Sequence, residues 1–497
     1  MTPAAGAGDV VVVGSGPNGL AAAVTLARAG LAVSVLEGDP MAGGGCRTRE
    51  LTLPGFRHDE CSAVHPTLLT SPFFRDGAFD GLRASLRQPE VAFAQPLDDG
   101  PAAAAYRSLD RTADALGSDG PAYRRLLAPL VRDAEAIADA VVGPLRTLPR
   151  HPVALARFGI PGLLPVGRLS RRFATDRARA LLAGAAAHSM VPLESVLTSA
   201  FSLVLTLSAH AVGWPVVEGG SSGITDALTA ELVRLGGSVT TGRWVRSLHE
   251  LPPSTAVVLD VGAAGFAELA GDALPAGYRR ALGRFRYGPG VCKVDWALAG
   301  PVPWTDEACR RAGTVHLGGT AAEVARSESE VAAGRHPDRP FCLVVQPGVV
   351  DPTRAPGDGR TLWAYCHVPS GSTVDMTAAI EAQIERFAPG FADLVLARST
   401  VTAAGRQVLN PNYVGGDIGA GANTLLQTLS RPVVRWNPYR TPLTGVYLCS
   451  ASTPPGGGVH GMCGYTAART VLHDHFGGPP PFGRDDRPTR SGPPAVG

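Results

Sequence analysis

Three glycines near the start of the chain have a spacing that suits the phosphates of a dinucleotide. Gly14, Gly16 and Gly19 form the pattern G-x-G-x-x-G, and Glu37 follows 18 residues after the last of them. The first glycine makes a tight turn, the second lets the backbone approach a pyrophosphate, and the third lets a helix and a strand pack closely. Glu37 can accept hydrogen bonds from both ribose hydroxyls, and its charge would repel a 2′-phosphate. These residues predict a site for FAD or NAD rather than NADP.

The elements that must position these glycines can be read from the same stretch. Residues 10–13 are four consecutive valines, as expected of a strand buried on both faces of a parallel sheet. An alanine-rich helix should run to about Ala29, Gly30 should end it, and residues 32–36 should form a second strand. The amino terminus of that helix offers free N–H groups to phosphates. Because strand, glycines, helix, second strand and acidic residue occur in order, a βαβ unit without a ligand is the weaker interpretation.

A second glycine-rich segment, MAGGGCRTREL, follows Glu37 closely. Gly43 and Gly44 would let the backbone lie against the far side of a bound dinucleotide, and Arg47 and Thr48 could hydrogen-bond its phosphates. A flexible surface loop is the alternative. The other cofactor contacts expected in this part of the chain are Gly14, Ser15, Gly16, Pro17, Asn18, Gly19, Glu37 and Gly38.

Composition places the chain among globular proteins without a strongly charged partner. Its 497 residues suggest two domains, and 45% hydrophobic with 18% charged residues exclude a disordered chain. A formal net charge of +2 gives no electrostatic case for nucleic acid. The first residues, MTPAAGAGD, contain neither a basic region nor an apolar core, so we expect no secretory signal and a cytoplasmic location.

Neither the cysteines nor other potential ligands indicate a metal. The eight cysteines are scattered without a C-x-x-C pair, which disfavours a redox-active disulfide and a structural zinc site. The spacing of His, Asp and Glu indicates no metal site either. A reduced intracellular protein with buried thiols is the simplest interpretation.

The middle of the chain is predicted to be mostly helical. Apolar residues recur at helical spacing within 102–148, the proline-rich segment 151–166 breaks the pattern, and a second helical region covers 171–212. Residues 195–217 contain no Asp, Glu, Lys or Arg. This stretch could be a membrane-spanning helix, a buried helix, or the wall of an apolar tunnel or membrane-dipping face. The sequence does not separate the last two.

The elements expected after this region alternate between strands and helices. We expect a helix over 225–235, strands at 257–261, 342–346 and 362–367, and an amphipathic helix over 376–387. Residues 352–360 and 410–423 are predicted to be loops.

Lys293 is the only lysine of the chain and lies on a predicted strand at 291–298. A lysine ammonium can lose its proton when it is desolvated, whereas arginine cannot, so Lys293 is a candidate for catalysis. A lysine that points to solvent from an edge strand is the alternative.

The carboxy-terminal part again has a strand, a glycine-rich loop and a helix. A strand at 446–449 leads into TPPGGGVHGMCG, and a helix should begin near Gly461. Small residues at a helix amino terminus suit close approach of a ligand with partial negative charge. We expect Ser452, Gly461 and Met462 to contact the cofactor, and His460 is a candidate for contact with the substrate.

The second glycine segment, the Lys293 strand and the carboxy-terminal block resemble the phytoene dehydrogenase (carotenoid desaturase-like) family of FAD-dependent oxidoreductases. They are most similar to its branch of pyridine nucleotide-disulphide oxidoreductase domain-containing proteins, and the likeness covers nearly the whole chain. The resemblance implies FAD as the cofactor, with Val245 touching the adenine through its backbone and Lys293 near flavin N5. It also implies that His58, Asp59 and His65 are candidates for lining the substrate cavity; polar residues with purely structural hydrogen bonds are the alternative.

The resemblance further implies an α/β fold in which an FAD-binding Rossmann-like domain of GR2 type is interleaved with an α+β substrate domain. The FAD-binding domain would comprise residues 1–72, 213–288 and 405–476, and the substrate domain 73–212 and 289–404, followed by a disordered tail at 477–497.

The expected activity is flavin-mediated hydride transfer, a desaturation, on a small apolar substrate such as an isoprenoid or a lipid. Oxygen or a quinone would be the final electron acceptor, and peripheral contact with a membrane is left open. A flavin amine oxidase that releases hydrogen peroxide is one alternative, although only 6% of the residues are aromatic. A flavin-bound regulatory protein without turnover is another.

Overall fold

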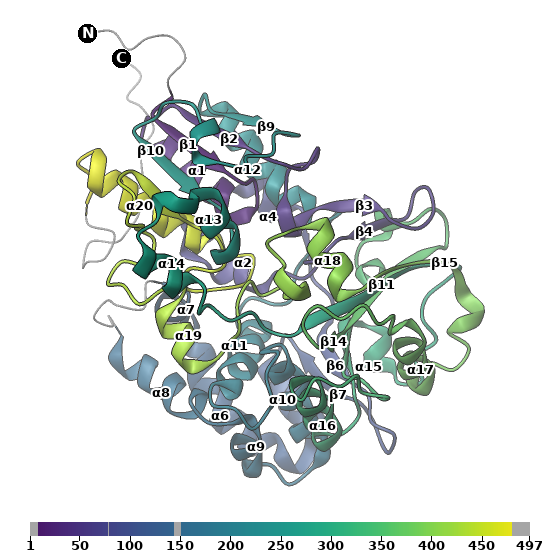
Figure 1. Ribbon diagram of the computed structural model, residues 1–497. Helices are drawn as coiled ribbons and strands as arrows, with labels where there is room; N and C mark the ends of the chain where they lie inside the picture. Colours follow the sequence, from purple (N-terminus) through teal and green to yellow (C-terminus); the bar gives the residue numbers. More distant parts are fainter. Residues whose placement is uncertain (1–7, 78, 144–150, 480–497) are drawn as a thin grey trace, which may run out of the picture.

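Two large sheets organise the computed structural model, which describes residues 8–77, 79–143 and 151–479 (Figure 1). The first is a parallel sheet with the strand order β16-β10-β1-β2-β9. Its strands are β1 (Val10–Val13), β2 (Val33–Leu36), β9 (Ser238–Thr240), β10 (Ala256–Leu259) and β16 (Val446–Leu448). They come from three distant parts of the chain, so the first and last elements lie in one layer.

The βαβ unit predicted at the amino terminus is confirmed. β1 lies between β10 and β2, where its valines are covered on both faces, and α1 (Pro17–Arg28) follows the glycine turn. α20 (Met462–His475) packs against α1. A Cβ atom added to Gly464 would lie 1.8 Å from the carbonyl oxygen of Asn18, so the two helices approach closely because this residue is glycine.

The second sheet is mixed and has the strand order β15-β11-β14-β13-β12-β6-β7. All its pairs are antiparallel except β12 with β6. Its strands are β6 (Val91–Gln95), β7 (Ala103–Tyr106), β11 (Gly290–Leu298), β12 (Ala312–Leu317), β13 (Cys342–Val345), β14 (Arg360–Val368) and β15 (Val395–Val401). These strands come from two parts of the chain, between segments that supply the first sheet.

Helices from the middle of the chain pack together beside the second sheet (Figure 1). α11 (Thr198–Ala211) contacts α6 (Gly120–Arg132), α8 (Pro152–Gly162) and α10 (Asp176–Ala187), and α10 contacts α16 (Ala321–Ala332). The stretch without charged residues therefore contains a helix packed within a bundle. Of the described helices, none combines the length and the hydropathy that crossing a bilayer requires.

Three sequence predictions about local structure are wrong. Residues 103–106 lie in the region 102–148 that was expected to be helical from the spacing of its apolar residues, but they form β7, which pairs with β6. Residues 152–162 were expected to be a break, but they form α8, because Pro152 occupies the first turn, where its missing N–H costs nothing. The resemblance places Val245 on the strand that follows the helix expected over 225–235, but that strand, β9, ends at Thr240 and Val245 lies beyond it.

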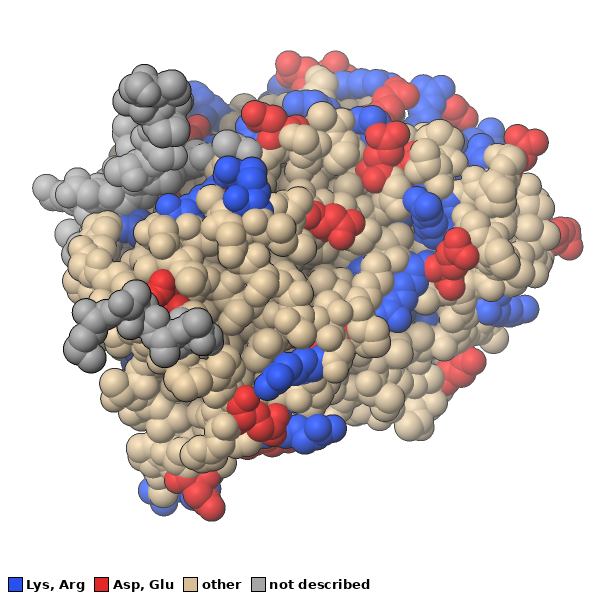
Figure 2. Space-filling view, turned by 90° about the horizontal axis from the view of Figure 1, so that it is seen from above, with Lys and Arg blue, Asp and Glu red and all other residues tan. Residues whose placement is uncertain are grey.

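The other predicted elements are present with shifted ends. The helix expected over 225–235 is α12 (Ser222–Arg234), and that expected over 376–387 is α17 (Thr377–Phe387). Most of the tail predicted to be disordered, 480–497, lies outside the described residues. Figure 2 shows Lys or Arg and Asp or Glu interspersed on one face of the molecule, without a large area of one sign.

Candidate functional site

The glycine-rich turn between β1 and α1 lies at the carboxyl edge of the parallel sheet, where ligands of such sheets bind. Gly14 has φ +102°, and a Cβ atom on Gly19 would lie 2.1 Å from the carbonyl oxygen of Gly14. A Cβ atom on Gly44 would lie 2.9 Å from the Cα atom of Gly16, so the second glycine segment packs directly on the turn. Side chains at these positions would displace the turn or its neighbours.

Glu37 at the end of β2 is held in place by the turn. Its Oε2 accepts hydrogen bonds from the Ser15 backbone N–H at 2.8 Å and the Ser15 hydroxyl at 2.6 Å, and its Oε1 accepts one from the Asp39 N–H at 2.9 Å. The carboxylate also lines the cavity described below. Its position at the end of the second strand is the one from which an acidic residue binds the ribose of a dinucleotide.

Asp260, at the end of β10, is a site residue that the sequence reasoning missed. Its Oδ2 accepts a hydrogen bond from the Gly19 N–H at 2.9 Å, and a Cβ atom on Gly16 would lie 2.7 Å from the same oxygen. Burial, reinforced by the nearby Glu37, raises the pKa of Asp260 to about 7. An acidic residue near the carboxyl end of the strand predicted at 257–261 was the signal that could have revealed it.

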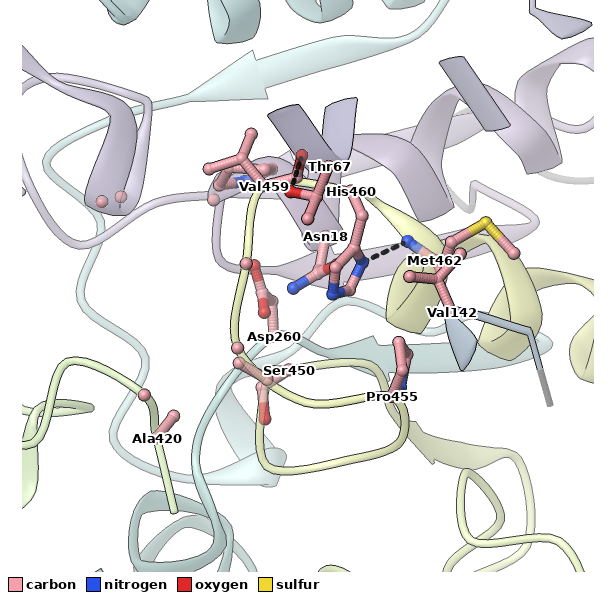
Figure 3. A pocket seen from close by; sticks show the side chains of 18 of the residues that line it. Asn18, Thr67, Val142, Asp260, Ala420, Ser450, Pro455, Val459, His460 and Met462 are labelled. Carbon is pink, nitrogen blue, oxygen red and sulfur yellow. Dashed lines mark hydrogen bonds between the residues drawn. The ribbon is translucent and has the colours of Figure 1, made fainter. Parts of the chain in front are cut away.

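The loop between β16 and α20 closes the other side of the site (Figure 3). Gly461 has φ +66° and precedes Met462, whose N–H donates to Nδ1 of His460 at 3.1 Å. Nδ1 therefore accepts, and Nε2 carries the proton and donates to the Gly456 carbonyl at 3.2 Å. Burial lowers the pKa of His460 to about 4, so the ring is neutral. Figure 3 shows this ring beside Asn18, whose buried Oδ1 has no hydrogen-bond partner among the residues that the structure describes.

These segments surround one end of a single cavity of about 4970 Å³, which is large enough for a dinucleotide and a second molecule. Eleven of the predicted residues line it: Gly14, Gly16, Pro17, Asn18, Glu37, Gly38, Gly44, Arg47, Val245, His460 and Met462. The remaining predicted residues lie outside its wall: Ser15, Gly19, Gly43, Thr48, His58, His65, Lys293, Ser452 and Gly461. Trp244, which packs against Gly38, also lines the cavity and was not predicted.

His58 and His65 were predicted to line the substrate cavity, but both are buried in polar contacts elsewhere. Nε2 of His65 is 2.9 Å from the Ser221 hydroxyl, and Nε2 of His58 is 2.8 Å from the Thr52 hydroxyl. Desolvation lowers the pKa of His58 to about 3 and that of His65 to about 4, so both are neutral. Their hydrogen bonds hold neighbouring segments together, which the sequence spacing alone does not reveal.

Asp59, the third residue predicted for the substrate cavity, lies beside these histidines in a buried ion pair. It accepts hydrogen bonds from the Thr48 hydroxyl at 2.7 Å, the Ser221 N–H at 2.8 Å and Nη1 of Arg354 at 2.9 Å. These contacts, despite the opposing effect of burial, hold the pKa of Asp59 below its ordinary value. Thr48 is thus engaged with Asp59 through its hydroxyl, and Asp59 links the second glycine segment to α12.

Lys293 is buried on β11, an internal strand, with only 1% of its side chain exposed. Its Nζ forms an ion pair with Asp295 and lies 5.1 Å from the centre of the Trp363 ring. Desolvation lowers the pKa of Lys293, and it raises the pKa of Asp295. Because Trp363 lines the cavity and Lys293 does not, the ammonium lies behind the wall rather than at the solvent, which excludes the edge-strand alternative.

Another part of the cavity wall, formed by segments other than the glycine turn and the α20 amino terminus, is largely apolar. Its wall includes Phe158 of α8, Phe201 and Val204 of α11, and Trp363 and Tyr365 of β14. The Trp363 and Tyr365 rings are stacked with their centres 5.8 Å apart. Phe201 and Val204 belong to the stretch 195–217, for which the wall of an apolar tunnel was one of the alternatives. Phe158, Trp363 and Tyr365 had not been assigned to the site from the sequence, because they come from two other, distant segments.

The residues around the glycine turn fit FAD. Glycines allow backbone contact with the pyrophosphate, Glu37 suits the adenosine ribose, and the unpartnered Asn18 Oδ1 and the α20 amino terminus face the same space. The same cavity also contains the apolar wall supplied by α8, α11 and β14. No group of His, Cys, Asp and Glu residues suited to a metal ion occurs within the described ranges.

Comparison with known proteins agrees with this geometry. Residues 12–74 match the family described as NAD(P)-binding Rossmann-like domain. The chain is 26% identical to pyridine nucleotide-disulfide oxidoreductase domain-containing protein 2 of Mus musculus, covering 94% of this chain and 93% of that protein. It is 34% identical to all-trans-zeta-carotene desaturase of Myxococcus xanthus over 25% of this chain and 24% of that protein.

The fold is also shared with solved structures. Cyclohexylamine oxidase from Brevibacterium oxydans superposes with a TM-score of 0.57 at 14% identity, covering 94% of this chain and 99% of that one. The chain is thus an oxidoreductase similar over most of its length to pyridine nucleotide-disulfide oxidoreductase domain-containing protein 2 and over a shorter part to all-trans-zeta-carotene desaturase.

Proposed function

We propose that this protein transfers a hydride from a largely apolar substrate, such as an isoprenoid or a lipid, in a desaturation. The observation that carries the proposal is the single cavity that joins the dinucleotide-binding turn to an apolar wall. Similarity to a carotenoid desaturase supports the same reaction class. The substrate would lose a hydride from one carbon and a proton from its neighbour, and a double bond would form between them.

Bound FAD would accept the hydride, and oxygen or a quinone would later remove the electrons. The protein's own residues would bind and orient the substrate and exclude water. α8 and α11 supply an aliphatic and aromatic wall, and Trp363 and Tyr365 cover the sheet side. Lys293, proposed to lie near flavin N5, would hold a positive charge behind Trp363 when protonated and balance the buried Asp295.

Anaerobic mixing of the FAD-loaded protein with phytoene, squalene and farnesol tests this proposal. We expect at least one of them to bleach the visible absorbance of the flavin and to yield a product that is two hydrogens lighter by mass spectrometry. The variant Phe201→Asp, which places a charge in the apolar wall, should lose this reaction and retain its flavin. Absence of bleaching with every apolar substrate tested would refute the proposal.

We also propose that the cavity opens toward a lipid surface. Leu163 at the end of α8 and Leu429 of α19 (Leu425–Ser430) both line the cavity and are 52% and 54% exposed. Ile160 of α8 is 70% exposed, and the segment that follows α8 carries the exposed Arg168. Apolar side chains near a basic residue suit contact with an anionic membrane. Flotation with anionic vesicles should recover the protein, and Ile160→Glu with Leu163→Glu should abolish the recovery.

A flavin amine oxidase is the second candidate, favoured by one observation. The stacked Trp363 and Tyr365 rings in the cavity wall could enclose the nitrogen of an amine. Release of hydrogen peroxide from putrescine or cyclohexylamine would support this alternative. Flavin reduction by isoprenoids without reaction toward amines would exclude it.

A further inference from the structure

Two histidines, His188 and His316, form a pair at the cavity wall, separate from the residues of the dinucleotide site. His188 follows the last residue of α10 and lines the cavity, and its side chain is partly exposed. His316 lies on β12 and is fully buried. Their Nε2 atoms are 2.9 Å apart, which is a hydrogen-bond distance, so one ring donates and the other accepts.

The surroundings keep this pair uncharged. Desolvation lowers the pKa of His188 to about 3 and that of His316 well below its ordinary value, and repulsion from a neighbouring histidine acts in the same direction. The rings of Phe93 and Phe341 lie 5.2 and 5.8 Å from that of His316 and shield it. The pair therefore offers neutral hydrogen-bonding atoms rather than a positive charge.

One nitrogen of the pair is available to a molecule in the cavity. Among the described residues, Nδ1 of His188 has no hydrogen-bond partner, and protein atoms do not enclose it completely. Nδ1 of His316 is also without a partner there, but it is enclosed. His188 can thus hydrogen-bond a ligand, while the contact with His316 fixes the orientation of the His188 ring.

The described lining residues that can be placed next to the pair carry no charge. Met190 lies two residues after His188, and Leu343 lies on β13 opposite His316. Asn423 is a polar neighbour, and its amide donates to the Ser189 carbonyl at 3.2 Å. A carboxylate or an ammonium ion buried beside a neutral imidazole would lack a counter-charge, whereas a hydroxyl or a carbonyl needs only a hydrogen bond.

We propose that His188, positioned by His316, binds an uncharged hydroxyl or carbonyl at the polar end of an otherwise apolar substrate. This inference rests on the proposed function and narrows its substrate class to isoprenoid or long-chain alcohols, aldehydes and ketones. Pure hydrocarbons have no group that could hydrogen-bond His188. Acids and amines carry a charge at neutral pH, which would lie beside a neutral imidazole without a counter-charge.

Binding of three related probes to the FAD-loaded protein tests the inference. Isothermal titration calorimetry would compare farnesol, β-farnesene and farnesoic acid, which share an isoprenoid chain and differ at its end. Because one buried hydrogen bond contributes about 1 kcal/mol, we expect farnesol to bind roughly 5- to 10-fold more tightly than β-farnesene. Farnesoic acid in its ionised form should bind more weakly than farnesol.

Three variants assign the preference to the histidine pair. His188→Phe should bind farnesol and β-farnesene equally, with its affinity for β-farnesene kept, and that kept affinity shows that the variant folds. His188→Asn, which retains a hydrogen-bonding amide, should keep part of the preference for farnesol. Tyr123→Phe is the matched control, because it removes a buried hydrogen bond to a histidine, His210, that does not line the cavity.

Equal binding of farnesol and β-farnesene by the unaltered protein would overturn the inference and leave the proposed function standing. A preference that survives in His188→Phe would overturn it too. Failure of the unaltered protein to bind either probe would overturn the inference and count against an apolar substrate as well.

Discussion

Replacing Asp260 by Asn should remove a pH-dependent cost from the folding of the apoprotein. Burial raises the pKa of this carboxyl from 3.8 to about 7, with a smaller contribution from Glu37 in the same direction. Between these two pH values, the folded protein keeps a proton that the unfolded chain has released. The stability of the unaltered protein relative to the variant should therefore fall as the pH rises from about 4 to about 7, and should stay constant above that.

The size of this effect follows from the two pKa values. Each unit between them corresponds to 1.36 kcal/mol, so the full cost is roughly 4 kcal/mol, of which about 3 kcal/mol develops between pH 5 and pH 8. Other groups near Asp260 contribute less, because burial raises the pKa values of the thiols of Cys449, directly after β16, and Cys463 of α20. Asn preserves an oxygen that can accept the Gly19 N–H, so packing should be retained.

Urea denaturation of the apoprotein at several pH values between 5 and 8 would measure this difference. Asp272→Asn serves as the control, because the Asp272 side chain is 100% exposed, and it should follow the pH profile of the unaltered protein. Parallel profiles for the unaltered protein and Asp260→Asn would refute the reasoning. Such a result would mean that the carboxyl ionises in the folded state as it does in the unfolded chain.

Three further predictions concern the cofactor site and the two sheets. Glu37→Gln should raise the dissociation constant for FAD about 10- to 100-fold, because a hydrogen bond to a charged group is lost. The control Glu250→Gln should leave this dissociation constant unchanged. Titration of each apoprotein with FAD, followed by flavin fluorescence, would measure both values. Gly464→Ala should lower the unfolding free energy by at least 3 kcal/mol, roughly the upper range for overpacking, because its Cβ would lie 1.8 Å from the Asn18 oxygen. Gly277→Ala, whose Cβ meets nothing within 4 Å, should change little, and equal urea midpoints for the two variants would contradict the packing argument. Lys293→Met should cost about 3–5 kcal/mol by leaving Asp295 buried without its partner, and the double variant with Asp295→Asn should recover most of that loss in the same assay.

The sequence predicts those parts of the site whose residues are contiguous and whose chemistry is local. The turn from Gly14 to Gly19 and the acid at Glu37 belong to one βαβ unit, and the spacing of the glycines is itself the geometric requirement of that unit. The amino terminus of α20 could be found for the same reason. Glycine and proline mark turns directly, because they change the allowed backbone angles rather than the packing.

Local propensity fails where pairing with a distant segment decides the structure. The alanines of β7 would favour a helix in isolation, and only their position beside β6 makes them a strand. Similarly, nothing in the neighbours of Lys293 distinguishes an exposed edge strand from an internal one. Its burial follows from the strands β14 and β15 on either side, which come from more than 60 residues further along the chain.

The amino-acid sequence by itself thus determined the amino-terminal βαβ unit and predicted a dinucleotide site there, because that information lies within about 30 consecutive residues. Only the tertiary structure brought Asp260 to Gly19, across 241 residues, and His188 to His316, across 128. It also removed His58 and His65 from the proposed substrate cavity. The physical reason is that burial and hydrogen bonding between distant segments depend on how the two sheets and the helix bundle pack, which no local spacing encodes.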